Sequence, residues 1–177
     1  GVRTTARVSP TISTFVAPGS DIHVTGGSFT IRTLSEGAAT ADARGIAAAP
    51  LAAVGVSIAK ATVTPTVSTY VGEGASIDAD GNITIETLHN YDAAGQMLDR
   101  KAKATASASA GALLGAGTGA DADAVSSATV STYVAPGATL RAGPAGAITI
   151  RSLSSNVAES DAGAIGAGIV AGVGTAL

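Results

Sequence analysis

The sequence predicts an all-β repeat protein, a parallel β-solenoid, and three observations predict it. An internal repeat runs through the chain, each repeat carries strand and turn patterns, and small residues dominate the composition. Of 177 residues, 39 are alanine and 23 are glycine, whereas aromatic residues make up only 3%. Ordinary globular cores depend on large apolar side chains. Repeats of strands without helices bury their apolar faces by stacking on one another, so we expect a narrow, Ala/Gly-rich interior.

The repeat consists of two short sequence boxes that recur three times in the same order. The first box occupies residues 11–19, 66–74 and 129–137, and the second occupies 29–34, 83–88 and 148–153. Equivalent aromatic residues lie 55 positions apart from Phe15 to Tyr70 and 63 apart from Tyr70 to Tyr133. The chain is therefore expected to form a single elongated block, 1–177, with repeats at approximately 1–56, 57–119 and 120–177.

Each repeat begins with a strand and a turn. The first box, Thr-Val-Ser-Thr-Tyr-Val in its second copy, alternates β-branched and aromatic residues and ends at Pro-Gly or Gly-Glu-Gly, which predicts a strand followed by a turn. Residues 21–24 and 75–78 read as short strands. Glycine-rich turns then lead into the second box, which is a further strand.

The third part of each repeat is an Ala/Gly-rich arm. From residue 101 to 112, alanine occupies every even position, and this period of two predicts a strand even though alanine favours helices. Residues 91–100 account for the length by which the middle repeat exceeds the first. We expect them to form a helical turn or loop that bulges from a regular stack.

The repeat length also suggests how many coils each repeat contains. A period of 55–63 residues fits about three coils of roughly 20 residues each. Phe15, Tyr70 and Tyr133 would then lie about 14 Å apart, packed in the core or at a corner rather than forming a platform for sugars. A β-sandwich or an antiparallel β repeat is the alternative fold.

The motifs Ser-Thr-Tyr-Val-x-x-Gly-Ala and Gly-(Asn/Ala)-Ile-Thr-Ile, followed by an arm ending in Val-Gly-Val, resemble those of large bacterial proteins. These are the filamentous-haemagglutinin-like and leukotoxin-type filamentous adhesins, and the resemblance covers the whole chain. It implies a right-handed parallel β-helix, export from the cell, and an adhesive or structural role. It transfers no catalytic residue.

Composition excludes several classes of function. The net charge is −3 and the ten basic residues are scattered, so nucleic-acid binding is not expected. The absence of cysteine excludes thiolate catalysis and disulfides. The most apolar stretches, 45–59 and 163–177, are each 15 residues long, which is too short to span a bilayer as a helix.

Candidate metal ligands are few. Asp78, Asp80 and Asn82 have the opening spacing of a calcium loop, but the closing position falls on His89, which cannot serve as the bidentate acid. A turn that is rich in Asp and Gly for backbone reasons is the preferred interpretation. Asp121 and Asp123 share a strand face and are expected to be solvated. No metal site is therefore predicted.

The same holds for catalysis and cofactors. Residues 115–119, Gly-x-Gly-x-Gly, lack the spacing of a dinucleotide loop. His23 and His89 fall at non-equivalent positions and are expected to be surface or turn residues. Threonines 30, 84 and 149 do not supply the regular ladder that ice binding requires. The acids that could cleave a polysaccharide are spread over the repeats rather than paired: Glu36, Asp42, Glu86, Asp92, Asp99, Glu159 and Asp161.

These observations predict a non-catalytic structural or adhesive shaft of a bacterial extracellular filament or giant adhesin, with no catalytic, cofactor-binding or metal residues. The expected partners are flanking repeats or other copies, head to tail, and host or matrix glycans, at the bacterial cell surface. The alternatives are a polysaccharide-active β-helix enzyme and a membrane-active toxin segment whose apolar arms enter lipid.

Overall fold

The protein is a parallel β-solenoid. The computed structural model describes residues 1–169 and 171–177, and within this part of the chain all regular structure is β-strand. Sixteen strands form five sheets, and every ladder that joins two strands within a sheet is parallel. The predicted solenoid is confirmed, and the alternative of a sandwich or antiparallel repeat is wrong.

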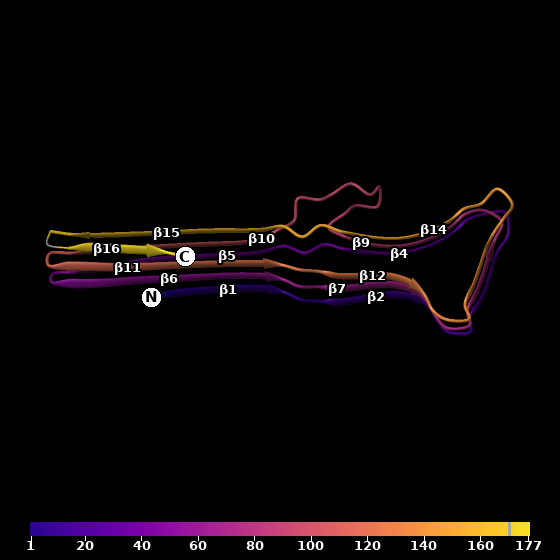
Figure 1. Cartoon of the computed structure of the whole chain (residues 1–177), viewed down its shortest axis with the longest axis horizontal. Coiled ribbons are helices and arrows are strands. Elements are labelled where there is room, and N and C mark those ends of the chain that lie inside the picture. Colours follow the sequence, from indigo (N-terminus) through magenta and orange to yellow (C-terminus); the bar gives the residue numbers. More distant parts are fainter. Residues whose placement is uncertain (170) are drawn as a thin grey trace.

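One turn of the solenoid consists of five strands, and its outline is visible in Figure 1. The first coil contains β1 (Val2–Val8), β2 (Thr11–Val16), β3 (Asp21–Val24), β4 (Phe29–Ser35) and β5 (Ala39–Ala49). The middle coil contains β6 (Ala52–Val63), β7 (Thr66–Val71), β8 (Ser76–Ala79), β9 (Ile83–His89) and β10 (Ala102–Ala112). The third coil contains β11 (Gly115–Ser126), β12 (Thr129–Val134), β13 (Thr139–Ala142), β14 (Ile148–Ser154) and β15 (Ala158–Gly168), and β16 (Gly172–Ala176) lies in a fourth layer.

Each sequence repeat is a single coil, so the expectation of three coils per repeat is wrong. Ser57 pairs with Val2 on one side and with Ala120 on the other, so equivalent residues of successive repeats are direct neighbours. The coil is long because its arm runs outward and back as strands of 11 and 12 residues, β10 and β11. A strand advances by about 3.3 Å per residue, so this arm extends for nearly 40 Å.

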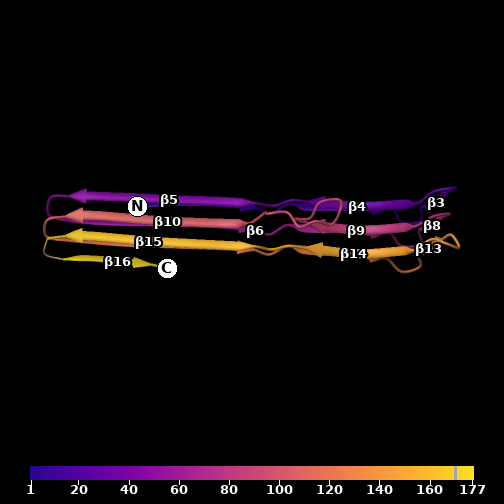
Figure 2. The same cartoon turned by 90° about the horizontal axis from the view of Figure 1, so that it is seen from above.

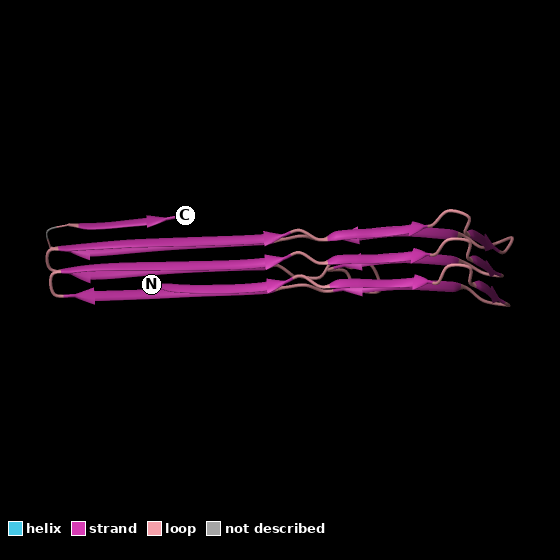
Figure 3. Ribbon diagram, turned by 90° about the horizontal axis from the view of Figure 1, so that it is seen from below, coloured by secondary structure: helices cyan, strands magenta, loops and turns pink. Residues whose placement is uncertain are grey.

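The three coils stack along the short dimension of the molecule (Figures 1 and 3). Figure 2 shows β5, β10 and β15 as successive layers, and Figure 1 shows the broader end of the coil to the right. The first and last described residues lie in the outermost layers, on opposite sides of the stack (Figure 3). Each coil therefore adds one strand spacing, about 4.8 Å, along the solenoid axis.

The arm has the narrow interior that the alanine pattern predicts. The even-numbered alanines of β10 point inward, and Ala104, Ala106 and Ala108 are at most 1% exposed. The two sheets of the arm approach so closely that the Ser57 hydroxyl donates to the Ser107 carbonyl across the interior, at 2.6 Å. A Cβ added to Gly55 would lie 2.9 Å from the Ser109 carbonyl oxygen. Larger apolar side chains have no room here.

The broad end of the coil holds the larger aliphatic side chains. Fully buried residues of β7, β8 and β9 fill it, among them Val71, Ile77 and Ile85. The turn after β7 contains Gly74 in the left-handed conformation with φ of 66°, and Gly19 and Gly137 repeat this conformation in the neighbouring coils. Because L-residues rarely adopt such angles, these glycines fix the turn that follows the first sequence box.

The insertion of the middle repeat leaves the stack as predicted, in the form of a loop. The pairing offset between the first and middle coils rises from 54 residues at Leu34 and Leu88 to 63 at Ala39 and Ala102. Nine extra residues are thus accommodated between β9 and β10 without disturbing either sheet. Asp92 organises the loop by accepting hydrogen bonds from the Ala94 and Gln96 amides.

Candidate functional site

The acidic turn at Asp78–Asn82 stabilises neighbouring coils. Asp80 accepts a hydrogen bond of 2.6 Å from the Gly26 amide in the first coil. Asn82 accepts one of 2.8 Å from the Ala147 amide in the third coil. These side chains satisfy backbone donors, which supports the interpretation as a structural turn. In the described part of the chain no three His, Asp or Glu residues gather in a group able to hold a metal.

His89 is fully buried, so its expected place at the surface or in a turn is wrong. Its Nδ1 lies 3.3 Å from the Ser35 hydroxyl, and its Nε2 is buried without a hydrogen-bond partner. Burial lowers the pKa of His89 because the charged ring would lose its hydration. The strand period would have revealed this position, since residues 83, 85, 87 and 89 share one face of β9.

Asn90, next to His89, is a second buried polar residue that sequence reasoning missed. It has a φ of 58°, and its carboxamide accepts from the Gly37 amide and donates to the Ser155 carbonyl. One side chain therefore connects all three coils at the point where the insertion begins. Asparagine tolerates this left-handed backbone better than most residues.

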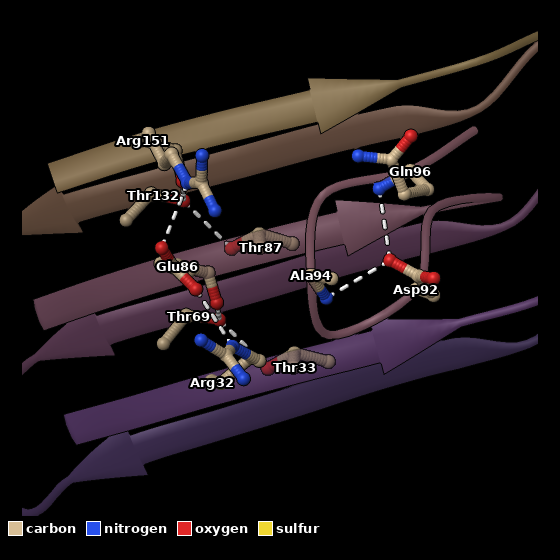
Figure 4. A network of polar contacts seen from close by, with 10 residues as sticks. All are labelled: Arg32, Thr33, Thr69, Glu86, Thr87, Asp92, Ala94, Gln96, Thr132 and Arg151. Atoms are coloured by element: carbon tan, nitrogen blue, oxygen red, sulfur yellow. Dashed lines mark hydrogen bonds and ion pairs between the residues drawn. The ribbon is translucent and has the colours of Figure 1, made fainter.

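An ionic ladder crosses the three coils at the broad end (Figure 4). Glu86 lies between Arg32 and Arg151, at 2.6 Å and 2.7 Å from their Nε atoms. Its side chain is only 4% exposed, whereas the arginines are 30% and 40% exposed. One carboxylate thus serves two guanidinium groups, and the ladder carries one net positive charge.

A ladder of hydroxyl groups runs inside the same region (Figure 4). The Thr69 hydroxyl lies 2.7 Å from both Thr33 Oγ1 and the Glu86 carbonyl oxygen. One coil further on, the Thr132 hydroxyl lies 2.7 Å from Thr87 Oγ1 and 2.9 Å from the Arg151 carbonyl oxygen. These hydroxyls satisfy one another within the interior, so they are part of the scaffold.

Most of the other candidate acids are also paired. Asp123 binds Lys60 of the adjacent coil at 2.6 Å, so it is not merely solvated, and Glu159 pairs with Lys101 and Lys103. The hydrogen bond from Lys103 holds the pKa of Glu159 below its usual value and raises that of Lys103. Further ion pairs are Glu36 with Arg100, Asp42 with Arg44, and Asp99 with Lys101. Five of the seven acids considered for polysaccharide cleavage are thus engaged in ion pairs.

The three equivalent aromatic rings form a stacked ladder, so the expected separation of about 14 Å is wrong. The ring centroids of Phe15 and Tyr70 are 5.1 Å apart and those of Tyr70 and Tyr133 are 5.0 Å apart, with interplanar angles of 9° and 3°. Phe15 and Tyr133 are about half exposed, so the rings lie on the outside and not in the core. Stacking covers both faces of the Tyr70 ring and one face each of the Phe15 and Tyr133 rings.

Two other candidate motifs lie on ordinary strands. The glycines at 115, 117 and 119 belong to β11 and pair with Ala52, Val54 and Val56, so they do not form a phosphate loop before a helix. Thr30, Thr84 and Thr149 pair directly across β4, β9 and β14. They form one row with a threonine in each of the three coils, so the expectation that they supply no regular ladder is wrong, because each repeat is a single coil.

The end of the arm carries eight of the exposed large apolar side chains, and we call it the apolar tip. It is formed by the turns that join the arm strands and by the residues beside them. Its exposed side chains, 54–87% accessible, are Ile46, Leu51, Val54, Leu113, Leu114, Ile165, Ile169 and Val173. The segments that build it, 45–59, 104–120 and 162–177, contain no charged residue. The described residues include no helix that could cross a membrane.

Comparison with known proteins adds no relative. No family model, no curated protein and no solved structure matches this chain.

Proposed function

We propose that this chain is a structural shaft, a block of a bacterial extracellular filament or giant adhesin that acts by stacking coil on coil. The observation that carries the proposal is the in-register pairing of whole repeats, with Ser57 between Val2 and Ala120. The outer ladders support it as well. Glu86, Asp123 and Glu159 each pair with a base of a neighbouring coil.

The resemblance to filamentous adhesins supports a place outside the cell, at the bacterial surface, and an adhesive role towards host or matrix glycans. Flanking repeats of the same protein, or further copies joined head to tail, are the proposed partners. A solenoid needs its outer coils to be covered, because exposed strand edges otherwise remain bare. Stacking of such partners on the outer strands of the parallel sheets would supply this cover.

Electron microscopy of chains extended after Leu177 by one, two or three copies of residues 59–177 tests the shaft, because residue 59 continues the register there. The particle should lengthen by about 10 Å for each two-coil copy, at constant width, because each coil adds one strand spacing. Particles that grow in width, or that remain compact, would contradict the shaft. Binding to immobilised matrix glycans, measured on the same series, tests the adhesive role separately.

The apolar tip favours a second candidate, a membrane-active segment whose arm enters lipid. Its backbone groups pair between coils and its segments carry no charge, which reduces the cost of entering hydrocarbon. Flotation with phosphatidylcholine vesicles tests it. The variant Leu113→Asp/Leu114→Asp should abolish binding, whereas Thr149→Asp at the broad end should leave it unchanged. Equal recovery of all three proteins with vesicles, or of none, would refute this candidate.

A further inference from the structure

The charged side chains on the outer faces of the solenoid alternate in sign from coil to coil. Wherever two charged residues occupy the same position in adjacent coils, their signs are opposite once His23 is counted as a base. The positions are Lys60 with Asp123, His23 with Asp78, Asp78 with Arg141, Arg32 with Glu86, Glu86 with Arg151, and Lys103 with Glu159. Like charges directly opposite one another on neighbouring strands are destabilising, which explains this pattern.

The ladder at Glu86 leaves an unbalanced charge on both outer coils. Arg32 and Arg151 share the single carboxylate between them (Figure 4), and their side chains are 30% and 40% exposed. A coil that stacks on either side brings its equivalent residue to about 4.8 Å from one of these arginines. A carboxylate there would complete the alternation, whereas a base would be repelled.

From this alternation we infer the identity of the partner surface: the coil that stacks on the third coil, β11–β15, carries acids opposite Arg141 and Arg151 and bases opposite Asp123 and Glu159. This inference rests on the proposed shaft, and it names the chemistry of the neighbour, whether that coil belongs to the same polypeptide or to another. The charged positions of the third coil thus call for a charge pattern of middle-coil type.

The middle coil of this chain satisfies all four requirements. A copy of it placed on the third coil would set Lys60 and Lys103 against Asp123 and Glu159, and Asp78 and Glu86 against Arg141 and Arg151. All four contacts repeat the sign relation that the middle and third coils already have.

The first coil does not satisfy them. Placed in register on the third coil, it would set Arg32 against Arg151 and Asp42 against Asp161, since these residues occupy the same positions through their common neighbours Glu86 and Thr105. With His23 again counted as a base, it would also face Arg141 through their common neighbour Asp78, so direct stacking of identical three-coil blocks is disfavoured by three like-charge contacts. The alternation selects which coil follows which.

Appending one coil to the full chain tests the inference. A copy of residues 59–112 is joined after Leu177, which continues the register because Ala176 pairs with Ala120 and Ala120 with Ser57. The residue that faces Arg151, Glu in the copy, is changed to Gln or to Arg. The matched control changes the copied Thr84, which faces the neutral Thr149, to the same two residues.

The thermal midpoint should fall by about 2–4 °C from Glu to Gln, and further from Gln to Arg. At the control position, the thermal midpoints should not follow this dependence on the charge of the substituted residue. At the position that faces Arg151, the differences in thermal midpoint among the Glu, Gln and Arg forms should shrink in high salt. A Gln or Arg variant as stable as the Glu form would overturn the inference and leave the shaft intact if scattering shows that the particle has lengthened. A particle that does not lengthen in any variant would overturn the shaft itself, and the inference with it.

Discussion

Replacing Ala106 by leucine should separate the inward face of the arm from the outward face. Ala106 is 1% exposed and lies between Ala43 and Ala162 of the adjacent coils. The next residue, Ser107, points outward and is partly exposed. The pair Ala106→Leu and Ser107→Leu therefore introduces the same side chain on the two faces of one strand.

The cost at Ala106 follows from the closeness of the two sheets. The Ser57 hydroxyl is only 2.6 Å from the Ser107 carbonyl oxygen across the interior, so the space between the sheets is less than a leucine needs. Overpacking a core typically costs 1–3 kcal/mol. We expect the upper end, about 3 kcal/mol, because each sheet is held by hydrogen bonds to both adjacent coils and cannot yield locally. For a chain of this size the thermal midpoint should fall by about 6–12 °C.

Urea unfolding and thermal unfolding, both followed by circular dichroism, measure the two variants against the parent. Ser107→Leu should remain within about 0.5 kcal/mol of the parent, as surface substitutions do. Equal losses for the two variants would refute the assignment of inward and outward faces. An Ala106→Leu variant as stable as the parent would show that the interior of the arm accommodates a leucine, contrary to the close approach of the two sheets.

Three further outcomes follow. Gly55→Ala should destabilise the arm by about 1–3 kcal/mol, because the added Cβ would lie 2.9 Å from the Ser109 carbonyl oxygen. Gly117→Ala has open space around the added Cβ and should be neutral or slightly stabilising. Equal urea midpoints for the two variants would contradict this prediction. The pKa of His89 is lowered in the folded state, so the unfolded chain binds the proton more readily and stability should fall as the pH drops below about 6.5. His89→Gln should remove this pH dependence of the urea midpoint. A pH profile that is the same in the variant and the parent would refute the role of His89. Glu86→Ala should lower the free energy of unfolding by about 3 kcal/mol, measured by urea unfolding, because two arginines lose their shared carboxylate. A loss below about 1 kcal/mol would show that the ladder contributes no more than ordinary surface ion pairs.

The strands and the direction of their side chains could be predicted because they depend on local patterns. Alternation of alanine with polar residues in 101–112 fixes which side chains point inward, and the copies at 11–19 and 66–74 fix the equivalence of strands. The position of the insertion followed from the difference in repeat length. None of these inferences depends on how many residues form one turn of the solenoid.

The number of coils per repeat could not be obtained in this way. A period in the sequence gives the distance between equivalent residues along the chain, but it does not say how many turns lie between them. Once each repeat is one coil, the alignment itself becomes a list of contacts, with Arg32 beside Glu86 and Phe15 beside Tyr70. The error in coil number therefore hid the ionic ladder and the stacked rings together. The burial of His89 was missed for a different reason. His89 was compared only with His23, and the face of its strand on which it lies was not considered.

The composition and the architecture explain each other. A flat arm filled with methyl groups buries little apolar area per residue, so hydrophobic burial within one coil contributes less than in an ordinary core. The remaining stability comes from contacts between coils: backbone hydrogen bonds along every strand, the hydroxyl ladder at Thr69 and Thr132, and the ionic ladder at Glu86. Such contacts act along the solenoid axis, and they are repeated whenever a compatible coil is added. A coil of this kind is weak alone and is strengthened by its neighbours, which is the property required of a unit in a long shaft.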